Sequence, residues 1–427
     1  MSISLKRKTR DDDDAGSSEQ MNKRQHREPI QAARYSTTPE PEEAGVSRLL
    51  LPNIAGPPPA HPPPLQQPSQ LLSFSYTQER ELVFDNSALR YYVEPPHGAD
   101  LTYRYEHWNK RPEERGRLDT LLKACLRPEV ASERTRANLV TWRGVMTKIL
   151  AAPYEDRDGW NLNVMSVNDT LYLEEHLTEE KLAAKESLTP RQRLQTYFGY
   201  SFESYCTSDV PPHEMSSEDR RYRDKIMGGW GGDVDTNVQW CSVVKTKIGN
   251  NVRLILGGEV DCVKDKYTGQ PDTFVELKTN QVIRNDADRR FFEKKLLKHY
   301  LQSYLLGVQN IVIGFRTPAG ALSTVERFQT QQLPRTVRER SNVWDPAVCL
   351  KWALDALKFV HTVVAKGSSR GISTPMWRLS FTPGQGLRLS ELDQAQIEEV
   401  RNGEDRVGFL PKSYYDVVNQ SPADMGF

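Results

Sequence analysis

The chain has 427 residues, of which 37% are hydrophobic and 27% are charged, and its formal net charge is zero. No apolar run approaches the roughly 20 residues that a membrane-spanning helix needs, and the N-terminus lacks the apolar segment of a secretory signal. We therefore expect a soluble globular protein with no membrane partner, in which any basic surface for nucleic acid is local. Its five cysteines include no CxxC pair, which argues against a zinc site of the usual spacing.

Residues 1–70 are rich in charge and proline, with DDDD near the start and GPPPAHPPP near the end. Such a segment has few apolar side chains to offset the entropy lost on ordering, so we predict a disordered N-terminal tail. The basic clusters KRK at 6–8 and KR at 23–24 fit a split nuclear-import signal, which would place the protein in the nucleus. A solvated charged tail explains these residues equally well.

Beyond the tail, residues 71–427 are predicted to form a single domain of the α/β (mixed α+β) class. The aromatic and β-branched residues of 71–93 favour short strands. Apolar residues at helical spacing predict a helix over 117–126. Segment 136–153 predicts a strand followed by a helical turn, and 189–206 predicts a polar helical stretch that leads into an aromatic strand.

The second half of the chain alternates predicted strands and helices. GGWGG at 228–232 reads as a flexible loop, and it lacks the GK[ST] of a phosphate-binding P-loop. Strands are expected in series over 238–279. The clearest helix covers 286–308, where apolar and aromatic residues recur every three or four positions and Gly307 marks the end. Further elements are expected at 310–317 (strand), 345–364 (helix, with Pro346 near its start) and 376–383 (strand).

Two of the predicted strands, GGEVDCV and FVELKT, carry acids inside apolar runs. Burying carboxylates is costly unless something compensates their charge. Strand residues two apart point the same way, so Glu259 and Asp261 share one face. The same holds for Glu276 and Lys278. In an antiparallel hairpin Asp261 would lie opposite Glu276, and the same register would place Glu259 opposite Lys278. One patch would then hold three carboxylates and one ammonium group.

A hard divalent cation makes such a patch tolerable, because Mg²⁺ or Mn²⁺ takes oxygen ligands from carboxylates, water and phosphate. The pattern therefore predicts metal-dependent hydrolysis of a phosphodiester or phosphoanhydride, with Lys278 stabilising charge on the phosphate. The alternative is a pair of half-exposed strands whose acids face solvent, and spacing alone does not decide between the two. Asp272 falls in the turn region, off the acidic face, so Asp261 is preferred as the metal ligand.

The predicted helix over 286–308 carries Lys295, Lys298 and Gln302 at spacings of three and four residues, so these side chains share a face. That face would suit the backbone of RNA or DNA. Taken alone, an ordinary solvated basic face is the simpler explanation.

A series of short segments stands in order along the chain: TWRG at 141–144, GYSFE at 199–203, GEVD at 258–261, ELK at 276–278, KHYLQSYLLGV at 298–308, GFRT at 314–317 and RVGFLPKSYYD at 406–416. Together they resemble the motifs of the DXO/Rai family of RNA 5′-end decapping nucleases, and its fungal Rai type in particular. The resemblance extends from about residue 75 to 420 and leaves the N-terminal tail out. Each motif is short, but their joint order is specific.

The resemblance implies a PD-(D/E)xK-like nuclease core of mixed β-sheets flanked by helices. It implies hydrolysis of RNA 5′ ends that lack a mature cap, namely 5′-triphosphate, incompletely capped and NAD-capped ends. It also implies a partner, the nuclear 5′→3′ exoribonuclease, and a divalent metal, Mg²⁺ or Mn²⁺.

Residue roles follow from the matched motif positions. The resemblance implies a metal site formed by Glu203, Asp261, Glu276 and the backbone carbonyl of Leu277. It implies catalytic roles for Glu259, Lys278 and Gln302, with Glu259 orienting metal-bound water. It implies substrate contacts from Arg143, Glu203, Lys278 and Gln302, where the forked donors of Arg143 suit a phosphate.

Two other functions fit parts of the same sequence. In the first, the chain is a non-catalytic stabiliser of an exoribonuclease, although such a scaffold has no need for costly clustered carboxylates. In the second, the chain is a DNA nuclease built on the same core, although no element that would read a DNA duplex is evident in the sequence.

Overall fold

Two mixed β-sheets dominate the computed structural model, which describes residues 45–420. The larger sheet has ten strands, in the spatial order β1 (Val46–Leu49), β16 (Gly386–Glu391), β15 (Trp377–Thr382), β6 (Trp160–Val167), β7 (Thr170–Glu175), β5 (Leu139–Trp142), β10 (Val252–Glu259), β9 (Gln239–Ile248), β2 (Ser69–Tyr76) and β3 (Leu82–Val83). The smaller sheet has six, in the order β14 (Leu322–Gln329), β13 (Asn310–Arg316), β12 (Phe274–Gln281), β11 (Cys262–Val263), β4 (Tyr91–Tyr92) and β8 (Thr207–Ser208). A separate pair joins β17 (Arg406–Val407) to β18 (Leu410–Pro411).

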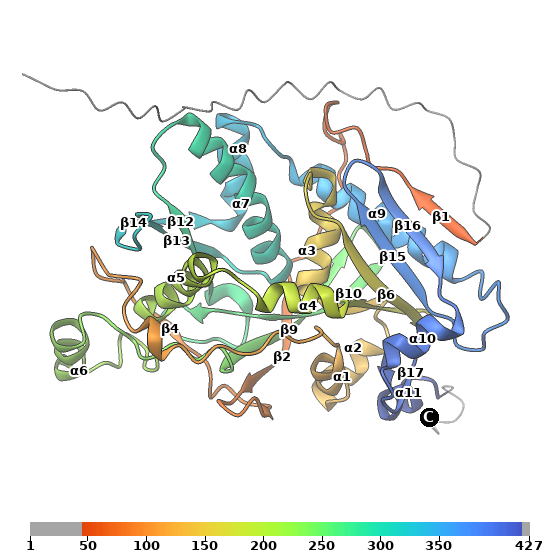
Figure 1. Cartoon of the computed structure of the whole chain (residues 1–427), viewed down its shortest axis with the longest axis horizontal. Helices are drawn as coiled ribbons and strands as arrows, with labels where there is room; N and C mark the ends of the chain where they lie inside the picture. Colours follow the sequence, from red (N-terminus) through yellow and green to blue (C-terminus); the bar gives the residue numbers. More distant parts are fainter. Residues whose placement is uncertain (1–44, 421–427) are drawn as a thin grey trace, which may run out of the picture. The chain divides into compact units, whose positions relative to one another are not determined.

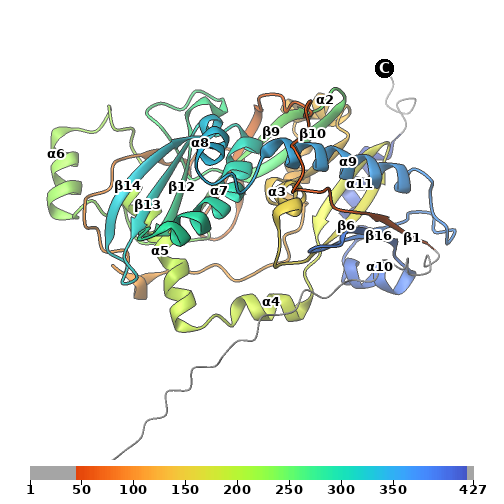
Figure 2. The same cartoon turned by 90° about the horizontal axis from the view of Figure 1, so that it is seen from above.

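Helices pack against these sheets and supply much of the core. They are α1 (Asp119–Cys125), α2 (Pro128–Arg134), α3 (Arg143–Ala151), α4 (Glu179–Glu186), α5 (Pro190–Cys206), α6 (Ser217–Arg221), α7 (Asp286–Leu306), α8 (Leu333–Arg340), α9 (Pro346–Val364), α10 (Gln394–Arg401) and α11 (Lys412–Val418). Figure 1 shows α3 and α7 between the strands of the smaller sheet and the β15–β16 end of the larger one. In Figure 2, α7, α3 and α9 follow one another along the domain. Apolar residues of these three helices share one buried cluster with strands of both sheets, so the helices tie the sheets together.

Parallel pairing is confined to the interior of the sheets. In the larger sheet β5 runs parallel to both β7 and β10, and in the smaller one β12 runs parallel to β13 and β11 to β4. Nearly every residue of β5 and β7 is buried. Strands covered on both faces are expected to be apolar throughout, and these sequences, LVTW and TLYLEE, are largely apolar, with one threonine each before the two glutamates of β7. The acidic end of β7 and the start of α3 therefore mark where the sheet opens toward polar surroundings.

The helix predicted over 286–308 is confirmed as α7. Its N-cap is Asn285, whose side chain accepts a hydrogen bond from the backbone of Asp288, and its C-cap is Gly307 with φ of 78°. A left-handed C-cap is the conformation that glycine adopts without steric cost. The helix predicted over 345–364 is confirmed as α9, with Pro346 in its first turn as expected.

The aromatic strand predicted at the end of 189–206 is wrong. The whole segment is one helix, α5, which starts with a capping box between Thr189 and Gln192. Its aromatic residues Tyr197, Phe198 and Phe202 are buried at helical spacing in a second apolar cluster. β-Propensity is a weak preference, and packing of this aromatic face against the smaller sheet overrides it.

The predicted end of the disordered tail is also wrong in part. Residues 1–44 lie outside the described part of the chain, and so do the basic clusters of the possible import signal. Segment 45–70 is ordered: β1 pairs antiparallel with β16, and Leu65 forms a bridge with Ile248. Leu49, Leu51 and Leu65 pack against the main apolar cluster, and these few leucines anchor the proline-rich segment. Among the helices within 45–420, none has the length and apolar character needed to cross a membrane.

Candidate active site

The chain crosses from one sheet to the other between β10 and β11, and the predicted acidic residues lie at this crossing. β11 pairs antiparallel with β12 in the register Cys262↔Val275, which continues to Asp261 beside Glu276. The Leu277 N–H donates a hydrogen bond of 2.6 Å to Asp261 Oδ2 and fixes that carboxylate against β12. The predicted neighbourhood of Asp261 and Glu276 is therefore confirmed.

The other half of the predicted hairpin is wrong. Glu259 is the last residue of β10 and pairs with Cys241 on β9 in the larger sheet, so it is not opposite Lys278 in a ladder. The expected continuous series of strands over 238–279 is thus divided between two sheets. Glu259 and Asp261 still line one pocket of about 180 Å³, since the crossing lies between them. We call it the acidic pocket.

Lys278 lies among the acidic groups as their counter-charge. Its Nζ is 2.7 Å from Glu276 Oε1 and 3.5 Å from Asp261 Oδ2, and it donates a hydrogen bond of 2.8 Å to the Leu277 carbonyl. The side chain of Glu276 is only 2% exposed. Buried charges of this kind persist only when they are paired, and Lys278 supplies the nearest positive charge.

Arg143 reaches the same group from the first turn of α3. Its Nη1 is 3.6 Å from Glu276 Oε2, and its Nη2 donates a hydrogen bond of 3.2 Å to the Glu259 carbonyl. The backbone of Gly258 passes close to this arginine: a Cβ there would lie 3.0 Å from Arg143 Cβ and 2.8 Å from Leu306 Cδ1. Glycine at 258 is what allows α3, α7 and β10 to meet at this point.

Glu203 joins the site from the last turns of α5 and lines the same pocket as Glu259 and Asp261. Burial, followed by the neighbouring Asp261 carboxylate, raises the pKa of Glu203 well above its usual value. Burial also raises the pKa of Asp261 to about 6, although Lys278 opposes the shift. Burial acts on Glu276 too, but Lys278 and Arg143 outweigh it and lower its pKa to about 2. The carboxylates cannot all ionise cheaply without further positive charge.

A divalent cation fits this donor set. Glu276 Oε2 is buried with no hydrogen-bond donor, and the nearby groups are hard oxygen ligands. Within residues 45–420, no three His, Cys, Asp or Glu side chains are gathered closely enough to hold a metal ion by themselves. Such a cation would therefore take part of its coordination from water and phosphate, as Mg²⁺ and Mn²⁺ commonly do.

The predicted basic face of α7 is mostly engaged within the protein. Lys298 Nζ lies 2.6 Å from Glu155 Oε2, and Lys295 Nζ lies 4.5 Å from the centre of the Phe291 ring. Gln302 is half-buried on the same helix, and no hydrogen bond joins it to the acidic groups in the described structure.

Four residues near the site were missed by sequence reasoning. His299 is close enough to Lys278 and Glu276 to feel both charges, and burial, followed by Lys278, lowers its pKa to about 3. Gln239, Tyr200 and Arg90 line the acidic pocket. Tyr200 and His299 fall inside the GYSFE and KHYLQSYLLGV motifs, which gave a signal for them. Gln239 and Arg90 come from segments that no motif marks.

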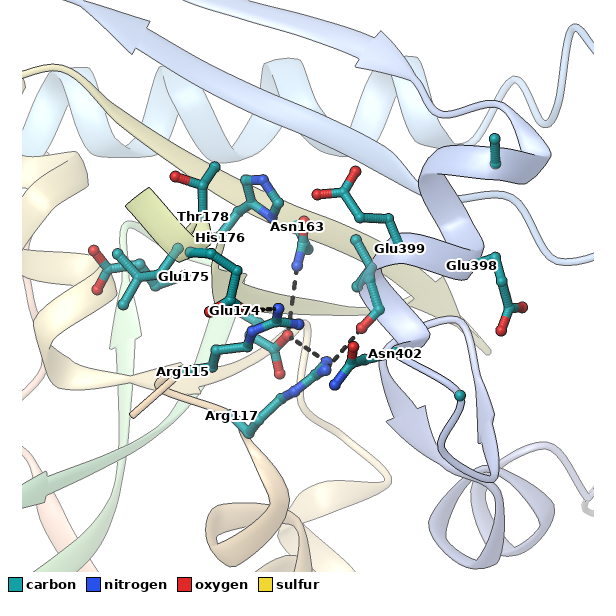
Figure 3. Close-up of a pocket in the computed structure, with 15 residues that line it drawn as sticks. Arg115, Arg117, Asn163, Glu174, Glu175, His176, Thr178, Glu398, Glu399 and Asn402 are labelled. Atoms are coloured by element: carbon teal, nitrogen blue, oxygen red, sulfur yellow. Dashed lines mark hydrogen bonds and ion pairs between the residues drawn. The ribbon is translucent and has the colours of Figure 1, made fainter. Parts of the chain in front are cut away.

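A larger pocket, of about 600 Å³, lies between the end of β7 and α10 (Figure 3) and contains none of the predicted site residues. Glu174 is its buried acid. Arg117 Nη1 lies 3.3 Å from Glu174 Oε1, the Asn163 amide donates to the same oxygen at 3.5 Å, and the Leu118 N–H donates to Oε2 at 3.2 Å. Because both Glu174 carboxylate oxygens have partners within the protein, we assign Glu174 a structural role.

This pocket gives a prediction about pH and stability. Burial raises the pKa of Glu174 to about 7. Between the unfolded value and pH 7 the folded state keeps a proton that the unfolded state releases, so the stability due to Glu174 is present at low pH and lost as pH rises to about 7. The difference in free energy of unfolding between Glu174→Gln and wild type should therefore move in favour of the variant as pH rises. The change should be on the order of 3 kcal/mol between pH 4.5 and 8.

Urea unfolding of both proteins across this pH range measures the effect. Glu398→Gln, which changes an exposed glutamate on the wall of the same pocket, is the matched control and should show a constant difference from wild type. A constant difference for Glu174→Gln as well would contradict the prediction.

Mixed sheets that bring the Asp261 and Glu276 carboxylates together around Lys278, beside a pocket that Glu203 also lines, fit a nuclease of the PD-(D/E)XK type. The family model described as RAI1 like PD-(D/E)XK nuclease matches residues 66–415, and the chain belongs to this family. A relative from Mycosarcoma maydis named decapping nuclease RAI1 is 34% identical over 462 residues, covering 86% of this chain and 90% of its own. The human decapping and exoribonuclease protein is 35% identical over 402 residues, covering 89% and 94%.

Solved structures agree with this assignment. Candida albicans Rai1, in complex with pU5-Mn²⁺, superimposes with a TM-score of 0.73 at 27% identity over 87% of this chain and 98% of its own. Scheffersomyces stipitis Rai1, in complex with (3′-NADP)⁺ and calcium ion, gives a TM-score of 0.71 at 27% identity over 85% and 97%. The chain is thus a decapping nuclease that acts on RNA 5′ ends, with the fold expected from its motifs.

Proposed function

We propose that this enzyme hydrolyses RNA 5′ ends that lack a mature cap, namely 5′-triphosphate, unmethylated-cap and NAD-capped ends, using Mg²⁺ or Mn²⁺. The observation that carries the proposal is the pair of buried carboxylates around Lys278, one of which, Asp261, lines the same pocket as Glu203 and Glu259. When bound, the cation would polarise a phosphoryl oxygen and lower the pKa of water. The pU5-Mn²⁺ and (3′-NADP)⁺ complexes of the two relatives support a nucleotide and a divalent ion as ligands.

The chain's own residues divide the work by position. Glu203, Asp261, Glu276 and the Leu277 carbonyl would hold the cation. Lys278 would donate to the scissile phosphate once its carboxylate partners turn to the metal, and Gln302 would approach the same phosphate from α7. Arg143, between Glu276 and the Glu259 carbonyl, would bind a phosphate oxygen with its forked donors. Glu259, on the far side of the sheet crossing, would orient the attacking water and accept its proton.

The biological setting proposed is the nucleus, with a 5′→3′ exoribonuclease that degrades the exposed RNA. The reason is chemical: removal of the 5′ group leaves an RNA end that such an exoribonuclease consumes.

A substrate panel tests the proposed function. Purified protein is incubated with 5′-triphosphate, unmethylated-capped, NAD-capped and monophosphate RNA, each with Mg²⁺ or Mn²⁺, and the released products are identified. We expect pyrophosphate, a cap dinucleotide and NAD from the first three. Degradation of the monophosphate RNA would add an exonuclease activity. If none of the four is consumed while an exoribonuclease is bound tightly, the stabiliser function is correct instead.

Arg90 provides a prediction about substrate binding. It is the cationic side chain among the described residues that line the acidic pocket, and it forms an ion pair with the exposed Asp209. A polyphosphate entering a pocket of carboxylates needs such a charge. Arg90→Ala should raise KM for 5′-triphosphate RNA about tenfold, the loss of one charged hydrogen bond, with kcat nearly unchanged.

Steady-state kinetics on 5′-triphosphate RNA measures this split between KM and kcat. Arg335→Ala is the control, because Arg335 pairs with Glu339 on the exposed surface of α8 and neither residue lines the pocket. An unchanged KM for Arg90→Ala would remove Arg90 from the substrate site.

A further inference from the structure

Glu259 is held by a hydrogen-bonded chain that no sequence motif marks. Gln239, the first residue of β9, donates a hydrogen bond of 2.8 Å from Nε2 to Glu259 Oε2. The register explains the contact: Glu259 pairs with Cys241, so Gln239 is its diagonal neighbour, two residues along the same face of β9. Both side chains line the acidic pocket.

Two arginines fix the orientation of the Gln239 amide. Its Oε1 accepts a hydrogen bond of 2.6 Å from Arg80 Nη1 and one of 2.8 Å from Arg111 Nη1. The amide oxygen and nitrogen of glutamine are distinguished by their partners, and here the oxygen faces two guanidinium donors. The amide N–H must then point at Glu259, because a flipped amide would oppose donor to donor.

The arginines are themselves held rigidly. Arg80 Nη1 also donates to the Asn237 carbonyl at 2.9 Å, and its guanidinium lies 3.6 Å from the centre of the Tyr76 ring. The backbone N–H of Arg111 donates a hydrogen bond of 2.8 Å to Thr236 Oγ1. Within residues 45–420 neither guanidinium has a carboxylate within ion-pair distance. The side-chain oxygen of Gln239 is the acceptor that the two guanidinium groups share.

From this geometry we infer that Gln239 is a positioning residue for Glu259, oriented by Arg80 and Arg111. One carboxylate oxygen of Glu259 is occupied by the Gln239 N–H, and the other remains for a ligand in the pocket. The carboxylate is therefore set in one rotamer before substrate arrives, which is the preorganisation that a water-orienting group needs. The inference rests on the proposed function only for the identity of that ligand; the pairing itself does not depend on it.

The test introduces the same substitution, glutamine to glutamate, separately at two positions of the acidic pocket. Gln239→Glu keeps the size of the side chain and the acceptors for both arginines, but it puts an oxygen against Glu259 in place of the N–H. We expect kcat on 5′-triphosphate RNA with Mn²⁺ to fall about 100-fold while KM stays within about threefold. Gln78→Glu is the matched control, because Gln78 is exposed at the same pocket and has no bond to Glu259. It adds the same charge and should keep the wild-type kcat.

A double variant separates the pairing from the chemistry. Gln239→Glu should lower the melting temperature by about 2 °C or more, and combining it with Glu259→Gln should restore the melting temperature because the donor and acceptor are exchanged. The double variant should remain inactive, since the carboxylate at 259 is gone.

Three results would overturn the inference: a wild-type kcat for Gln239→Glu, a loss expressed in KM instead of kcat, or additive effects on melting temperature in the double variant. If wild-type protein hydrolyses none of the RNA ends, the proposed function fails. In that case, recovery of the melting temperature in the double variant is the measurement that decides whether Gln239 holds Glu259.

Discussion

Asp261→Ala and Glu276→Ala should each reduce hydrolysis of RNA 5′ ends at least about 1,000-fold. Both carboxylates would hold the divalent cation, whose charge stabilisation is worth several kcal/mol, and about 4 kcal/mol corresponds to a factor of 1,000 in rate. The fold should survive. Asp261→Ala leaves the Leu277 N–H without its 2.6 Å acceptor, which costs about 1–3 kcal/mol, but it also relieves repulsion from Glu203 and Glu276.

Single-turnover kinetics on 5′-triphosphate RNA measures the loss, and circular dichroism melts establish that each variant is folded. Asp272→Ala is the matched control. Asp272 also precedes the ELK motif, as an acid in a PD pair does, but it lies in the turn Pro271–Thr273 and bonds to the Thr268 hydroxyl. It should keep wild-type activity. Normal metal-dependent turnover by Asp261→Ala or Glu276→Ala would show that the metal site lies elsewhere.

The parts of the site that sequence reasoning found are those set by local geometry. Alternation along a strand puts Glu276 and Lys278 on one face, and a symmetric loop fixes Asp261 beside Glu276; both hold in the structure. Helix α7 was predictable because its apolar positions repeat locally and Gly307 ends it.

The parts that were not found depend on contacts between distant segments. Nothing in GGEVDCV shows that the chain changes sheets after Glu259, because both strands are equally apolar and the change is imposed by pairing with β9. The chain from Arg80 and Arg111 through Gln239 to Glu259 joins residues up to 179 positions apart in sequence (259 − 80), each of them ordinary in its own segment. The aromatic residues of α5 were misread because an aromatic-rich segment suits a strand as well as a helix face until its packing partner is known.

Lys278→Met should both abolish activity and lower the free energy of unfolding. The ammonium group is the nearest positive charge to Glu276 Oε1, at 2.7 Å, and it also neutralises Asp261. Removing one member of a buried ion pair costs about 3–5 kcal/mol because the remaining charge is left unpaired. We expect about 3 kcal/mol, the low end of that range, since the Lys278 side chain is 24% exposed and solvent screens part of the charge. Arg143, 3.6 Å from Glu276, would compensate only in part.

The distinguishing measurement is stabilisation by metal in the absence of RNA. Without Lys278 the carboxylates lose their internal cation and should bind Mn²⁺ more tightly, so Mn²⁺ should raise the melting temperature of Lys278→Met more than that of wild type. Lys298→Met is the control: the Lys298 side chain is 55% exposed, so solvent screens its ion pair with Glu155, which should contribute about 1 kcal/mol without any dependence on Mn²⁺. Equal stabilisation of Lys278→Met and wild type by Mn²⁺ would mean that Lys278 and the cation do not share carboxylates. In that case Lys278 would be a partner of Glu276 in the fold and not a group that exchanges places with the metal.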